Sequence, residues 1–158
     1  MNSIVLLQPG KTFFGENVTE KLTKDNLILT SDKILFLIAS PVIDLIHPVV
    51  EKISSISKEV DVIEYNFRGE PTFGQFKSLL SKSKKINPDC VVGIGGGSVL
   101  DCAKLLAALT HNTQKVTEIV GIDFLKSRCK KLICIPTTSG TGSEMSPNAI
   151  LLNEETQA

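Results

Sequence analysis

The sequence predicts an α/β fold, a doubly wound and mostly parallel β-sheet with helices on both faces. Four short apolar runs alternate along the chain with longer segments whose apolar residues recur at three-and-four spacing. Two of the runs lead directly into loops rich in glycine, serine and threonine. Strands alternating with helices indicate right-handed βαβ units, which bring ligands to the carboxyl ends of the strands.

The expected strands are residues 33–39, 60–65, 90–94 and 132–135. Each is mostly apolar and too short for a helix. Strands that helices cover on both faces of a parallel sheet have this composition, whereas a half-exposed strand alternates polar and apolar residues. We therefore place all four in one sheet.

The expected helices are residues 42–57, 73–85 and 98–109. The first has one apolar stripe, formed by Val42, Leu45, Ile46, Val49, Val50, Ile53 and Ile56. The second has a similar stripe and a basic end that suits the helix dipole, formed by Phe73, Phe76, Leu79 and Leu80 and by Lys82, Lys84 and Lys85. The third would pack onto the sheet through Leu100, Ala103, Leu106 and Ala107.

Length and composition predict one globular domain over residues 1–158. No internal repeat or linker-like stretch divides the chain. Lys and Arg together number 17, as do Asp and Glu, so no net charge favours nucleic acid or an anionic membrane. Residues 1–7 lack the basic region of a signal peptide. We expect a cytoplasmic protein with no nucleic-acid and no membrane partner.

The cysteines and histidines offer no metal-ligand set and no catalytic residue. The cysteines have no CxxC spacing and lie in or beside apolar stretches, so we expect reduced core residues at Cys90, Cys102, Cys129 and Cys134. The two histidines, His47 and His111, are far apart in the sequence.

The most informative segment follows the third expected strand. Three glycines at 95–97 separate this strand from the helix at 98–109. Glycine lets backbone N–H groups approach a phosphate, and a helix start adds unpaired N–H groups and a positive dipole end. Ser98 suits the helix N-cap, and Asp101 completes a capping-box pattern. Lys104 either reaches a phosphate or stays a solvated charge.

The spacing of this turn matches neither GxGxxG nor GK[ST], and a glycine turn also serves a tight connection without a ligand. A second loop, residues 137–144, follows the fourth strand with several hydroxyls and two glycines. Alone, such a loop is usually a connector. Two loops of small residues at one rim of a sheet favour a nucleotide cleft.

Together the two loops resemble the paired signatures of the iron-containing (group III) alcohol dehydrogenases. The first signature is carried by Gly95, Gly96, Gly97, Ser98, Asp101 and Lys104. The second is carried by Pro136, Thr137, Thr138, Gly140, Thr141 and Glu144. Residues 69–72, 118–121 and 148–150 are also similar to the family, so the resemblance covers essentially the whole chain.

The resemblance implies the N-terminal, Rossmann-like domain of a dehydroquinate synthase-like fold, which in the family precedes a helical metal-binding domain. Family members move hydride between NAD or NADP and an alcohol or aldehyde carbon, while a divalent metal (Fe or Zn) polarises the oxygen. The implied partners are a nicotinamide dinucleotide and a small alcohol or aldehyde. The resemblance leaves a homo-oligomer open.

Matching positions imply the cofactor-binding residues Gly95, Gly96, Gly97, Ser98, Asp101, Thr137, Thr138 and Ser146. The glycine turn and the serine after it would hold the pyrophosphate. Asp101 would order this turn and lie near the cofactor. The two threonines, with a contribution near Ser146, would contact the adenosine or nicotinamide side.

The chain departs from the family at three places. Ala39, Ser40 and Pro41 stand where many members carry an acid that reads the adenosine ribose, so NADP stays open beside NAD. Glu70 stands where many have Asn, and it receives no role because a carboxylate beside phosphate is unhelpful. The family's Asp and three His metal ligands lie beyond the second loop and have no match here. We therefore expect a fragment that binds nucleotide weakly and does not turn over.

Two alternatives remain at this point. A glycerol dehydrogenase or dehydroquinate synthase relative would have a similar glycine turn, although Lys104 speaks against the synthase. A stand-alone nucleotide-binding or interaction module would have the same fold without catalysis.

Overall fold

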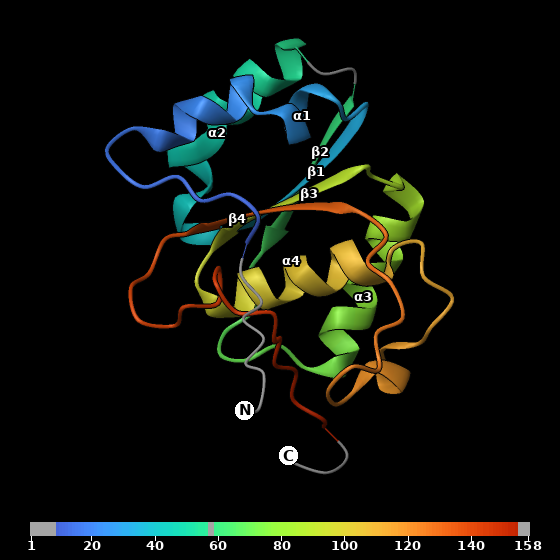
Figure 1. The fold of residues 1–158 in the computed structure, drawn as a ribbon. Coiled ribbons are helices and arrows are strands. Elements are labelled where there is room, and N and C mark those ends of the chain that lie inside the picture. Colours follow the sequence, from blue (N-terminus) through green and yellow to red (C-terminus); the bar gives the residue numbers. More distant parts are fainter. Residues whose placement is uncertain (1–8, 57–58, 155–158) are drawn as a thin grey trace, which may run out of the picture.

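A computed structural model describes residues 9–56 and 59–154. Its centre is a parallel sheet in the strand order β2-β1-β3-β4 (Figure 1). The strands are β1 Lys33–Ala39, β2 Glu59–Tyr65, β3 Cys90–Gly95 and β4 Lys131–Pro136. The main helices are α2 Ile43–Ile56, α3 Phe73–Ile86 and α4 Gly97–Leu109. The shorter ones are η1 Val18–Lys24, α1 Asn26–Leu29, η2 Ser40–Val42 and η3 Val116–Ile119.

The pairing register aligns the carboxyl ends of neighbouring strands. Ala39 at the end of β1 lies opposite Tyr65 at the end of β2. Gly95 at the end of β3 lies opposite Pro136 at the end of β4. The loops that follow the strands therefore leave the sheet from one rim, as the predicted βαβ arrangement requires.

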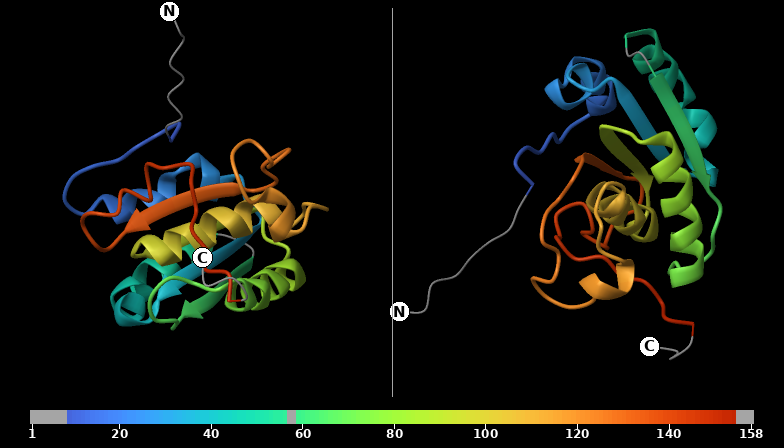
Figure 2. Two further views of the ribbon diagram at one scale, coloured as in Figure 1. Left: turned by 90° about the horizontal axis from the view of Figure 1, so that it is seen from below. Right: turned by 90° about the vertical axis from the view of Figure 1, so that its right-hand side faces the viewer.

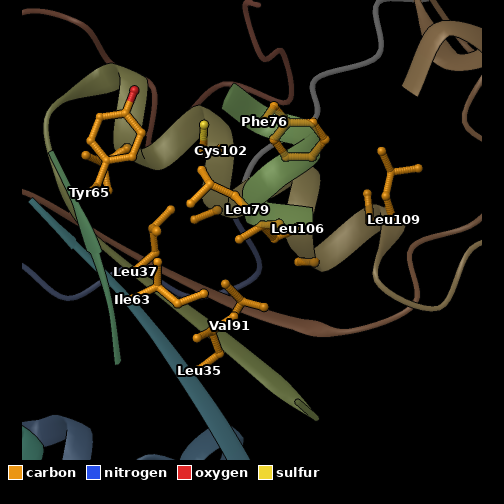
Figure 3. Close-up of a cluster of buried hydrophobic side chains, with 14 of the residues drawn as sticks. Leu35, Leu37, Ile63, Tyr65, Phe76, Leu79, Val91, Cys102, Leu106 and Leu109 are labelled. Atoms are coloured by element: carbon orange, nitrogen blue, oxygen red, sulfur yellow. The ribbon is translucent and has the colours of Figure 1, made fainter. Parts of the chain in front are cut away.

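One face of the sheet packs against α3 and α4, and Figure 3 shows this cluster of side chains. Leu35 and Leu37 of β1 and Val91 of β3 point to this face and are fully buried. The neighbouring strand residues, such as Phe36 and Val92, point to the opposite face, where α2, η1 and α1 cover them. Both faces are covered at the centre of the sheet, which is why β1 and β3 read as almost continuous apolar runs, whereas the edge strand β2 carries exposed acidic residues.

The predicted doubly wound α/β fold is confirmed, and each predicted strand is present with its ends within one residue. The predicted stripe of α2 is too wide. Ile46, Val50 and Ile53 are buried, but Leu45 and Ile56 are 77% and 52% exposed. A single row of residues one helical turn apart is enough to cover this edge of the sheet.

Two of the four cysteines are core residues, as predicted. Cys90 and Cys102 are fully buried, whereas Cys129 and Cys134 are half-buried. Residue 57, at the end of the predicted first helix, and residues 1–7 lie outside the described part of the chain. Among the described residues, no helix combines the length and apolar character needed to cross a membrane.

Candidate functional site

The glycine turn connects β3 to α4. Gly96 is the N-cap of α4, with extended backbone angles, and the helix begins at Gly97. The Gly96 carbonyl accepts the N–H groups of Val99 and Leu100, both at 3.1 Å. The prediction that Ser98 caps this helix is wrong, because the backbone of Gly96 already begins it. Ser98 lies in the first turn, and its hydroxyl donates a hydrogen bond to the carboxylate of Glu70 at 3.4 Å.

Close packing explains the glycines in and before this turn. A Cβ at Gly93 would lie 2.5 Å from the Cβ of Ala103, and one at Gly95 would lie 2.7 Å from Cγ2 of Val99. The absence of a side chain at Gly93 and at Gly95 lets α4 lie directly on β3. Because α4 lies so close, its N-terminus starts at the rim where β3 ends.

The turn also touches the second loop. A Cβ at Gly96 would lie 3.3 Å from Oγ1 of Thr138, and one at Gly97 would lie 3.0 Å from Cγ2 of Thr141. The N–H of Thr137 donates to the carbonyl of Gly95 at 2.9 Å, which continues the β3–β4 ladder by one bond. The two loops that the sequence singled out are therefore neighbours at one rim of the sheet.

The geometry of these loops fits an anionic group. The N–H groups at the first positions of a helix have no preceding carbonyl to bond within the helix, so those of Gly97 and Ser98 can serve a ligand. Both Thr137 and Thr138 are exposed beside them. A helix of 13 residues adds the positive end of its dipole at the same place.

Asp101 holds the second loop onto α4. Its carboxylate accepts the hydroxyl of Ser143 at 2.6 Å and the N–H of Ile150 at 3.0 Å. It also pairs with Lys104 at 2.8 Å, and the two side chains are only 10% and 11% exposed. The sequence predicted that Asp101 would order the glycine turn. Its hydrogen bonds instead fix residues 143–150 against the helix.

Lys104 is not a solvated charge, because its side chain is only 11% exposed, and that predicted role is wrong. Its other predicted role, at a phosphate, stays a prediction. Its ammonium group donates to the carbonyls of Ser143 at 3.0 Å and Ser146 at 3.2 Å, and also to that of Asn148. Figure 2 shows the segment after β4 passing alongside α4, where these contacts form. The sequence signal for the ion pair with Asp101 was the position of this lysine, three residues after an aspartate on an otherwise apolar helix.

Ser146 belongs to this anchored loop. Its N–H donates to the carbonyl of Gly142 at 3.1 Å, and its hydroxyl accepts the N–H of Asn148 at 3.1 Å. The structure thus brings the glycine turn, Ser98, Thr137 and Thr138 together. Asp101 and Ser146 lie behind this group and support it.

The loop after β2 forms the third side of the site. Burial raises the pKa of the Tyr65 phenol, and nearby Cys102, Glu70 and Asp101 add to the effect. Burial likewise raises the pKa of the Cys102 thiol to about 12, with a contribution from Asp101 and from Glu70. The hydrogen bond from Ser98 places the Glu70 carboxylate at the first turn of α4.

Within residues 9–56 and 59–154, no group of three or more His, Cys, Asp or Glu side chains could hold a metal ion. His47 pairs with Glu51 on α2, at 3.6 Å, on an exposed surface. The described residues therefore do not fit the metal of the family, and we assign no chemical step to a metal here.

Comparisons with known proteins agree on one family. Residues 9–158 match the family of iron-containing alcohol dehydrogenases. Alcohol dehydrogenase 4 of Saccharomyces cerevisiae is 31% identical over 150 residues, which are 93% of this chain and 39% of the yeast protein. Alcohol dehydrogenase 4 of Schizosaccharomyces pombe is 37% identical over 107 residues, covering 66% of this chain and 25% of that protein.

Solved structures show the same relationship. An alcohol dehydrogenase from Oenococcus oeni superposes on 99% of this chain with a TM-score of 0.86 and 27% identity. NADH-dependent butanol dehydrogenase A from Thermotoga maritima superposes with a TM-score of 0.84 and 26% identity. The chain spans 42% and 40% of these two structures. From the family match over residues 9–158, the identity to the yeast relative and the shared fold, the chain belongs to the iron-containing alcohol dehydrogenase family.

Proposed function

We propose that residues 95–98 bind the diphosphate of NAD or NADP and that residues 137–138 contact its adenosine or nicotinamide side, within an oxidoreductase that interconverts an alcohol and an aldehyde. One observation carries the proposal. The glycine turn and the threonine loop leave adjoining strands and touch each other, Gly96 against Thr138 and Gly97 against Thr141. Side chains in the turn would fill the space in which a diphosphate could approach the backbone.

Each group has a distinct role in this proposal. The N–H groups of Gly97 and Ser98 donate to phosphate oxygens, and the dipole of α4 favours the negative charge. The hydroxyls of Thr137 and Thr138 bind the adenosine or nicotinamide side. Asp101 and the loop containing Ser146 support these groups from behind. The bound nicotinamide supplies the hydride acceptor or donor.

The choice between NAD and NADP depends on the end of β1. Ser40 follows this strand, and its hydroxyl donates to the carbonyl of Tyr65 at 3.1 Å. No acid stands at 39–41 to repel a 2′-phosphate, so NADP is compatible with this site. The NADH dependence of the butanol dehydrogenase from Thermotoga maritima supports NAD.

The rest of the activity is proposed from the family. The metal ligands and the substrate contacts would lie outside the described residues, so the proposed domain over residues 1–158 binds nucleotide and does not turn over alone. A cytoplasmic location and a homo-oligomer remain predictions.

Gly97→Ala tests the proposal. The added methyl would lie 3.0 Å from Thr141 in the space between the loops, while alanine favours a helix more than glycine does. We expect at least about a ten-fold loss of NAD and NADP affinity by calorimetric titration, because the methyl keeps the phosphates away from the N–H groups and so weakens charge-assisted hydrogen bonds. A cooperative melting transition shows that the variant is folded. Gly10→Ala is the control, because a Cβ there meets nothing within 4 Å. Absence of binding by the unaltered intact protein, or equal affinities of both variants, would overturn the proposal.

A further inference from the structure

Glu70 lies at the proposed nucleotide site, although it received no role from the sequence analysis. Its carboxylate accepts the hydroxyl of Ser98 at 3.4 Å, in the first turn of α4. Ser98 is one of the residues proposed to hold the diphosphate. A negative side chain therefore contacts a group that a negative ligand would need.

The backbone around Glu70 is fixed. Gly69 before it has a φ of +73°, a conformation that favours glycine, and Pro71 after it is buried. The carbonyl of Pro71 accepts the N–H of Leu152 at 2.9 Å, and the N–H of Phe73 donates to the carbonyl of Leu152 at 3.0 Å. These bonds hold the backbone of this loop to Leu152, and the exposed carboxylate of Glu70 reaches the first turn of α4 through its contact with Ser98.

We propose that Glu70 lowers the affinity of the glycine turn for a nicotinamide dinucleotide, because its carboxylate engages the Ser98 hydroxyl and repels the phosphates. The inference rests on the proposed function. The free site holds a carboxylate where the positive end of the α4 dipole favours an anion. A dinucleotide must displace this contact and then remain near the same charge.

Glu70→Gln removes the charge and keeps the shape of the side chain. The probe is NAD, titrated into the intact protein at an ionic strength of about 0.01 M and again at about 1 M. We expect Glu70→Gln to bind NAD roughly five-fold more tightly at low salt, the effect of one partly screened charge near the surface. At high salt the difference should fall below about two-fold. Glu51→Gln, which removes an exposed carboxylate on α2, is the control and should leave the affinity unchanged.

Each outcome has a separate meaning. Weaker NAD binding by Glu70→Gln would overturn the inference and show the carboxylate to be a ligand, for example of a ribose hydroxyl. Equal binding by Glu70→Gln and the unaltered protein would overturn the inference alone, because the site would still bind NAD. Absence of binding by both would overturn the proposed function.

Ser98→Ala tests the contact itself. While Glu70 engages the hydroxyl, removing that hydroxyl costs little NAD affinity. In the Glu70→Gln background the hydroxyl is less strongly held, so Ser98→Ala should weaken NAD binding more, by roughly three-fold over its effect in the unaltered protein. The same loss in both backgrounds would show that repulsion acts without the Ser98 contact and would overturn that part of the inference.

Discussion

Replacing Lys104 with methionine should destabilise the protein far more than an ordinary surface substitution. The change removes one partner of an ion pair whose two side chains are 11% and 10% exposed. It also removes the donor to the carbonyls of Ser143, Ser146 and Asn148. Loss of one partner of a buried pair costs about 3–5 kcal/mol. Asp101 keeps its hydrogen bonds from Ser143 and Ile150, so the lower end, about 3 kcal/mol, is expected.

The melting temperature is the direct measurement. For a domain of this size about 3 kcal/mol corresponds to a fall of roughly 6–12 °C. Lys52→Met, on the exposed side of α2, is the matched control and should change it by no more than about 2 °C. Adding Asp101→Asn to Lys104→Met should recover part of the loss, because the unpaired buried charge is then gone. A Lys104→Met variant with the same melting temperature as the Lys52→Met control would refute the reasoning.

Two further predictions follow from packing and charge. Gly93→Ala should lower the free energy of unfolding in urea by about 1–3 kcal/mol, because its methyl would lie 2.5 Å from the Cβ of Ala103. Gly10→Ala is the control and should change this free energy little. Equal urea midpoints for the two variants would contradict the packing argument. The N–H of Leu27 lowers the pKa of Asp25 from its ordinary value, so the folded state binds that proton less readily than the unfolded chain. The stabilisation of the fold by ionised Asp25 is present above about pH 4 and is lost as pH falls below it. Asp25→Asn should therefore flatten the dependence of the urea midpoint on pH between about 5 and 2. An equally steep curve for this variant would contradict the role given to Asp25.

The sequence was sufficient for the sheet and for the position of the two loops. A strand covered on both faces has an unmistakably apolar composition, and parallel strands necessarily end at one rim. The sequence was not sufficient for the start of α4. A capping pattern is a pattern of side chains, whereas α4 begins at the backbone carbonyl of Gly96. The stripe of α2 was overestimated because apolar residues such as Leu45 can also face solvent.

Long-range contacts account for the remaining differences at the site. The environment of Lys104 is made by carbonyls about 40 residues later in the chain, 39 for Ser143 and 44 for Asn148. The local spacing of Asp101 and Lys104 on α4 indicates their ion pair, but no local pattern predicts the carbonyls that Lys104 also binds. The position of Glu70 similarly depends on backbone bonds to Leu152. Composition predicted which loops gather at the rim, but not which charges the surrounding chain brings to them.

The hydrogen bonds of Asp101 and Leu152 have a consequence for protein engineering. A boundary drawn after the last strand, at Pro136, would look natural from the succession of strands and helices. It would nevertheless leave the Lys104–Asp101 pair without the carbonyl, hydroxyl and N–H partners of residues 143–150, and would release the loop that carries Glu70. A chimera built from two relatives should therefore take residues 69–72, the helix α4 and residues 137–152 from the same parent.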